Sequence, residues 1–137
     1  MQLSAVRISA KVALGAALVM TLVACSSSAS EGQPHASPPP DADLTVVAEN
    51  MSFDTSEIVL EAGKETLLYF VNRDGDQHNL AIYPDADGGE PLFRGELIGE
   101  GSTEYRIPAL EPGTYHFQCD PHAPIMNGTV VVEGDGS

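Results

Sequence analysis

The sequence predicts an all-β domain, either a Greek-key sandwich or a barrel, and three observations point to this class. Seven short apolar stretches alternate in the manner of strands, turn-forming residues separate them, and no convincing apolar stripe has a helical period. Short strands at this spacing are typical of sandwiches and barrels. The chain has 137 residues, which suit one domain with a modest core and leave little for a second domain.

Residues 1–24 predict an export signal that is removed from the mature protein. Arg7 and Lys11 precede an apolar run at 12–24. This run has 13 residues and is too short to span a bilayer comfortably. Basic residues, a short apolar stretch and then small residues are typical of a signal peptide.

The apolar run ends in the letters LVAC, which resemble the lipobox of bacterial lipoproteins. The resemblance implies that residues 1–24 are a lipoprotein signal peptide and that Cys25 becomes the lipid-carrying first residue. Two alternatives are a simple secretory signal with Cys25 as a spare thiol, and a disulfide between Cys25 and Cys119. Residues 25–43 are rich in serine and proline and have no apolar face, so we expect a flexible tether to the extracytoplasmic face of a bacterial cell membrane.

The predicted domain spans residues 44–134, and residues 135–137 form a short C-terminal tail. The expected strands lie at 44–50, 57–62, 65–72, 78–83, 102–107, 113–119 and 128–133. Turn signals between them are AGK at 62–64, RDGDQ at 73–77, DADGG at 85–89 and EPG at 111–113.

The charge distribution argues against a nucleic-acid partner. All 20 acidic side chains follow Cys25, whereas only four of the six basic side chains do. Proteins bind nucleic acid by neutralising its phosphates with cations, and this chain offers few. A basic surface on a partner protein would be attracted to it, although the acidity also serves simply to keep an exported domain soluble.

The stretch 115–133 gathers side chains that bind soft metal ions. Cys119 and His122 are three positions apart in CDPH, so one tight turn could direct both at one ion, and Met126 follows them. A thiolate, an imidazole and a thioether together suit copper in both of its oxidation states. His78 begins a predicted strand and could add a second imidazole, but only a folded sandwich would bring it close.

Each of these residues also has an ordinary structural explanation. Cys119 could be a buried core cysteine, His122 a turn residue, and Met126 a core methionine like Met51. His116 is a different case, because strand alternation places it on the face opposite Cys119, where we expect it to face solvent. His35 lies in the predicted tether and is expected to be solvated.

At these residues the chain resembles the cupredoxin family, most of all its plastocyanin and amicyanin members. The resemblance covers about residues 44–133 and lies in MSFD at 51–54, AGK, FVN at 70–72, HN at 78–79, and YHFQCDPH with the following methionine and NGTVVV. It implies an eight-stranded Greek-key β-sandwich with one type 1 copper ion at one end. His78, Cys119 and His122 would bind the ion, and Met126 would be a long axial ligand.

The resemblance also implies how the ligands are held. Asn79 would hydrogen-bond towards Asp120 and tie the two ligand loops together, with its backbone amide directed at the Cys119 sulfur. Pro121 would stiffen the loop. The sequence departs from the family in two places. Three residues separate His122 from Met126, where amicyanin has two and plastocyanin four, and Gln118 replaces the aromatic residue that plastocyanins carry before the ligand cysteine.

The implied function is one-electron transfer and not catalysis, since the predicted ligand set leaves no free coordination position and no paired base or nucleophile is visible. Electrons would pass through the exposed edge of His122. Ala123, Pro124 and Ile125 would surround that edge with an apolar patch for transient docking of a redox protein with a basic or apolar surface. We expect a monomer. The alternatives are a protein that captures or delivers copper, and a metal-free structural module.

Overall fold

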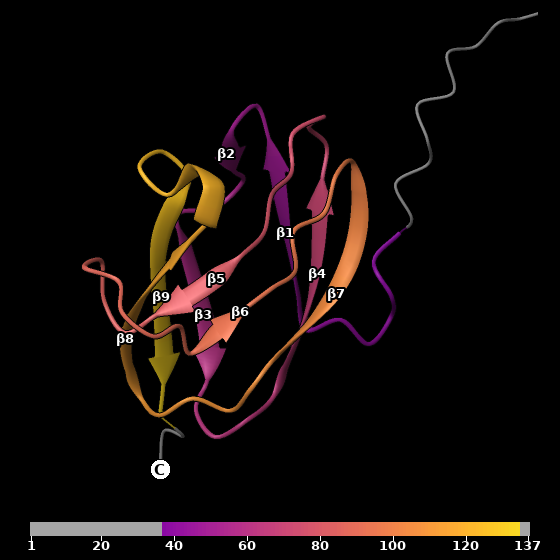
Figure 1. Cartoon of the computed structure of the whole chain (residues 1–137). Helices are drawn as coiled ribbons and strands as arrows, with labels where there is room; N and C mark the ends of the chain where they lie inside the picture. Colours follow the sequence, from indigo (N-terminus) through magenta and orange to yellow (C-terminus); the bar gives the residue numbers. More distant parts are fainter. Residues whose placement is uncertain (1–36, 135–137) are drawn as a thin grey trace, which may run out of the picture. The chain divides into compact units, whose positions relative to one another are not determined.

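The alternating apolar runs form the strands of two sheets that pack face to face in the computed structural model, which describes residues 37–134 (Figure 1). The predicted signal peptide at 1–24, the lipidation site Cys25, His35 and the tail at 135–137 lie outside the described residues. Of the predicted tether, residues 37–43 are described and contain no strand or helix. Asp43 is already attached to the domain, because its amide donates to the Leu67 carbonyl at 2.9 Å.

The first sheet has four strands in the order β2-β1-β4-β7. Their bounds are β1 Leu44–Glu49, β2 Ser52–Phe53, β4 Thr66–Asn72 and β7 Gly101–Ile107. The second sheet has five strands in the order β3-β9-β8-β5-β6. Their bounds are β3 Glu57–Glu61, β5 Ala81–Tyr83, β6 Phe93–Arg94, β8 Gly113–Gln118 and β9 Asn127–Glu133.

Both sheets are mixed, because β1 pairs with β4 and β3 pairs with β9 in parallel while the other pairs are antiparallel. The chain crosses repeatedly from one sheet to the other. These connections confirm the predicted Greek-key β-sandwich. The barrel alternative is wrong, since the two sheets of residues 37–134 remain separate.

Three elements differ from the expected strand ranges. The strand expected from His78 begins only at Ala81, because His78 instead forms an isolated bridge with Ile98, with amide-to-carbonyl hydrogen bonds of 3.0 Å in both directions. Strands β2 and β6 lie outside the expected ranges. Each has two residues, which are too few to show an alternating pattern.

The core lies between the sheets and extends to the end of the sandwich that carries the loop at 119–126, named the ligand loop. Strand β3 alternates strictly, with Ile58 and Leu60 buried, whereas β4 is buried along its whole length as an inner strand between β1 and β7. Phe117 of β8 packs against Phe53 with ring centroids 5.3 Å apart. Cys119 and Met126 belong to the same core cluster. The ligand loop is therefore attached to the hydrophobic core through Cys119 and Met126.

A single 3-10 turn, η1 (Asp120–His122), connects β8 to β9. In Figure 1 it lies at the end of the sandwich where β1 and β4 also finish, beside the β1–β2 loop. Within residues 37–134, no helix has the length and apolar character needed to cross a membrane.

Candidate metal centre

The ligand loop between β8 and β9 is a compact, internally bonded turn. Cys119 is the last extended residue after β8. Pro121 is the second residue of η1, where its fixed φ suits the first turn and its missing N–H costs no hydrogen bond. The His122 amide donates to the Cys119 carbonyl at 3.0 Å, and the Met126 amide donates to the His122 carbonyl at 2.9 Å. The Cys119 amide donates to the Met126 carbonyl at 2.9 Å and closes the loop.

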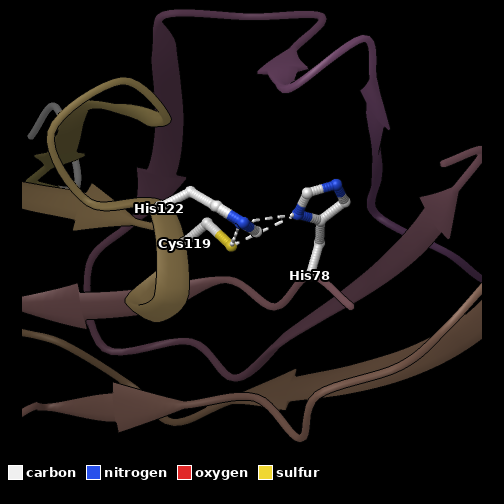
Figure 2. A group of neighbouring side chains, drawn as sticks. All are labelled: His78, Cys119 and His122. Atoms are coloured by element: carbon white, nitrogen blue, oxygen red, sulfur yellow. Dashed lines mark hydrogen bonds between the residues drawn. The ribbon is translucent and has the colours of Figure 1, made fainter. Parts of the chain in front are cut away.

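This loop and the segment after β4 bring three donor atoms together (Figure 2). The Cys119 Sγ atom lies 3.5 Å from Nδ1 of His78 and 3.6 Å from Nδ1 of His122, and the two Nδ1 atoms are 3.1 Å apart. A point equidistant from the three atoms lies about 2.0 Å from each, close to the usual metal–nitrogen and metal–thiolate distances of roughly 2.0 to 2.3 Å. The triangle therefore has the dimensions of a trigonal metal site.

The chemistry of the donors fits copper. His78 and Cys119 are fully buried, and His122 is partly exposed at the surface. Two imidazoles and one thiolate form the His₂Cys set that is typical of blue copper sites. In the described part of the chain, these three residues are the one cluster of histidine, cysteine and acidic side chains with the geometry to hold a metal ion.

Met126 lies at the base of the loop. Its side chain is 1% exposed and packs in the same core cluster as Cys119. The backbone bonds to Cys119 and His122 fix its position next to two of the proposed ligands. Axial ligation by the Met126 sulfur stays a prediction.

Burial raises the pKa of the Cys119 thiol, and hydrogen bonds from the backbone amides of Asn79 and His122 offset only part of this effect. The backbone amide of Asn79 therefore donates to the Cys119 sulfur. The thiol is the resting form without metal, so an arriving ion must displace its proton.

Asn79 and Asp120 connect the two segments that carry the ligands. The Asn79 side-chain amide donates to Asp120 Oδ2 at 3.1 Å, and the Asp120 backbone amide donates to Asn79 Oδ1 at 2.8 Å. The reciprocal pair places His78 and Cys119, one residue before each partner, at a fixed separation.

Asp120 has further partners that the sequence analysis missed. The Tyr83 hydroxyl donates to Asp120 Oδ1 at 2.6 Å, and Nε of Arg94 lies 3.0 Å from Oδ2. Burial acts to raise the pKa of Asp120, but hydrogen bonds from Tyr83, Asn79 and Gln118 and the Arg94 charge outweigh it and hold the pKa below its usual range. Asp120 therefore remains an anion next to Cys119.

Asp74 is a second residue that the sequence analysis missed. Its Oδ2 atom lies 2.9 Å from Nε2 of His78, on the side of the ring away from Cys119. Hydrogen bonds from the Met51 amide lower the pKa of Asp74 most, burial opposes them, and the Asn50 amide and His78 lower the pKa further. A carboxylate four residues before a proposed histidine ligand was the available signal.

The predicted docking residues Ala123, Pro124 and Ile125 directly follow His122 in the loop. Ile125 is 63% exposed and Pro124 is exposed, whereas Ala123 is half-buried beside His122. His116 lies on β8 with its side chain partly exposed, while the next residue, Phe117, is buried. It contributes no atom to the cluster.

A β-sandwich with a buried cysteine and two histidines at one end defines the class of mononuclear blue copper proteins. Residues 14–132 match the family model of the cupredoxin-like domain. Amicyanin-alpha of Methylorubrum extorquens is 32% identical over 94 residues, which are 69% of this chain and 75% of that protein. The crystal structure of amicyanin from Paracoccus versutus is 34% identical, with a TM-score of 0.53, and the match covers 69% of this chain and 84% of that one.

Auracyanin A, a "blue" copper protein from Chloroflexus aurantiacus, shares the fold with a TM-score of 0.57 at 23% identity, over 65% of this chain and 96% of its own. The chain belongs to the cupredoxin family. Its amicyanin relatives are electron carriers and not enzymes.

Proposed function

We propose that the protein carries single electrons between redox partners through one copper ion held by His78, Cys119 and His122, with Met126 as axial ligand. The observation that supports this most strongly is the triangle of donor atoms, whose dimensions fit the ion directly. The ion would supply the Cu(I)/Cu(II) couple. The core packing, the closed loop and the Asn79–Asp120 pair hold the donors in place, so few atoms have to move when the charge changes.

The surface next to His122 is the proposed exit for electrons. His78 is fully buried, whereas His122 is partly exposed and is followed in the loop by Ala123 and Pro124. Ile125 adds an exposed apolar side chain. An apolar patch without charged side chains allows close contact and easy separation, which suits a transient redox partner with an apolar or basic surface.

The competing function is copper capture or delivery, and the rate of electron self-exchange separates the two. A carrier should exchange electrons rapidly between its Cu(I) and Cu(II) copies and keep its copper when a chelator is added. Line broadening in nuclear magnetic resonance spectra measures the exchange, and absorbance measures the retained copper. Slow exchange together with rapid loss of copper would favour delivery.

We also propose that the domain is exported and anchored through lipid on Cys25, with residues 25–43 as its tether. The lipobox-like LVAC and the tether composition support this. Cys25→Ser is expected to move the protein from the membrane fraction to the soluble fraction of the cell, as detected by immunoblotting. Since Cys25 is not a proposed metal ligand, copper binding should be retained. A variant that stays in the membrane fraction would contradict the lipid anchor.

The axial assignment of Met126 has its own test. Met126→Leu preserves volume and apolar character, so the core should remain intact. Loss of a thioether donor destabilises Cu(II) more than Cu(I), and the reduction potential should rise. Protein-film voltammetry measures the change. An unchanged potential would mean that Met126 serves only as a core residue.

A further inference from the structure

His78 has a second contact that none of the proposed ligands accounts for. Its ring is fully buried, with Nδ1 directed at Cys119 and His122 and Nε2 directed away from them (Figure 2). On that far side, Oδ2 of Asp74 lies 2.9 Å from Nε2. Nδ1 therefore faces the other two proposed ligands, whereas Nε2 faces a carboxylate outside that set.

This contact determines which nitrogen carries the proton. An ionised carboxylate can only accept a hydrogen bond, so the Nε2 position must hold the hydrogen. In the neutral ring the Nδ1 atom is then left with its lone pair, and it is this atom that lies 3.5 Å from the Cys119 sulfur. The contact thus prepares His78 to bind a metal ion through Nδ1.

Asp74 is itself held from two sides. Its Oδ1 accepts a hydrogen bond from the Asn50 amide at 2.8 Å, and its Oδ2 accepts one from the Met51 amide at 3.0 Å. Asn50 and Met51 have φ values of 55° and 58°, a left-handed conformation that is disfavoured for residues other than glycine. Successive amides in such a conformation form a concave site for an anion.

A third contact comes from the buried end of β4. The Asp74 amide donates to Oδ1 of Asn72 at 2.8 Å, and the Asn72 side-chain amide donates to the carbonyls of Asp76 and Ile98. The carboxylate is therefore oriented by the β1–β2 loop and by β4. It does not depend on a bound ion for its position.

We propose that Asp74 is a positioning residue of the copper centre, which fixes the tautomer and orientation of His78 and lowers the reduction potential. A carboxylate that draws on the Nε2 proton makes the imidazole a stronger donor. The stronger donor and the nearby negative charge both favour Cu(II) over Cu(I). This inference rests on the proposed function, because it assumes a copper ion at His78, Cys119 and His122.

The test compares the reduction potentials of the purified copper-loaded wild type, Asp74→Asn and Asp76→Asn. Asparagine keeps the size of the side chain and an oxygen that can accept hydrogen bonds, so the loop should still fold. Mutation of a residue that hydrogen-bonds to a metal ligand typically changes metal affinity by about 10- to 100-fold. A tenfold loss of Cu(II) affinity relative to Cu(I) raises a one-electron potential by about 59 mV. We expect at least this rise for Asp74→Asn, with the blue absorption band retained.

Asp76→Asn is the matched control. Asp76 is exposed in the same loop, so this variant removes the same charge without touching His78. Solvent screens an exposed charge, so the reduction potential of Asp76→Asn should shift much less than that of Asp74→Asn. Asp74→Glu restores a carboxylate and should lie closer to the wild type than Asp74→Asn does.

A second readout follows the His78 ring directly. In the diamagnetic Cu(I) wild-type protein, the Nε2 proton of His78 should appear downfield and exchange slowly with water, and it should move upfield in Asp74→Asn. Equal potentials for Asp74→Asn and Asp76→Asn, or an unchanged Nε2 resonance, would overturn the inference. A wild type without a blue copper spectrum would overturn the proposed function itself, and the wild type alone would show this.

Discussion

Cys119→Ser is expected to abolish the blue absorption of the copper-loaded protein and to weaken Cu(II) binding by more than about 100-fold, since even outer partners of ligands are worth about 10- to 100-fold. The intense band of a blue copper site arises from the thiolate, which serine lacks. The serine hydroxyl is similar in size but is a hard, neutral donor at pH 7. Visible spectroscopy and competition with a copper chelator measure the two effects.

Cys25→Ser is the control for this experiment, because Cys25 is the only other cysteine of the chain. It should leave the band unchanged. Circular dichroism should show the same strand content in Cys119→Ser as in the wild type. A blue band that persists in Cys119→Ser would rule out Cys119 as the metal ligand.

Ile125→Lys is expected to slow electron self-exchange between Cu(I) and Cu(II) copies by at least about tenfold, which corresponds to about 1.4 kcal/mol. Close approach through the His122 edge would bury this apolar side chain on both copies. A lysine there would require two like charges to lose water and face each other. Nuclear magnetic resonance line broadening at fixed ionic strength measures the rate.

Two further variants show whether slower exchange in Ile125→Lys comes from blocking the His122 edge. Val59→Lys adds the same charge at an exposed apolar position on β3, so it reports the effect of net charge alone. Gln118→Ala tests an alternative electron exit at Gln118, the residue that precedes Cys119. We expect both to exchange electrons much faster than Ile125→Lys. Equal slowing by Ile125→Lys and Gln118→Ala would contradict the His122 exit.

The sandwich could be predicted because its strands are amphipathic. Ile58 and Leu60 alternate with exposed residues along β3, and such alternation is visible in a linear sequence. The choice between sandwich and barrel was not visible, since both have strands of the same length and spacing. The short β6 carries too few residues for any pattern, and its pairing with β5 is a tertiary contact.

The ligands could be predicted because Cys119 and His122 are close in sequence and chemically unusual in this chain. Asp74 was interpreted only as part of a turn signal, and its contact with His78 depends on the conformation of the β4–β5 loop. Tyr83 and Arg94 reach Asp120 from neighbouring strands of the folded sheet. The donor side chains can be predicted from the sequence, whereas the residues that orient them can be identified only in the folded structure.

The most direct test of the copper centre is to add one equivalent of Cu(II) to the purified protein and record its visible and electron paramagnetic resonance spectra before and after ascorbate. The His78–Cys119–His122 triangle predicts an intense blue thiolate-to-copper band with narrow hyperfine splitting, which ascorbate bleaches and reoxidation restores. A colourless protein, or one with only the weak spectrum of tetragonal copper, would contradict a blue copper electron carrier.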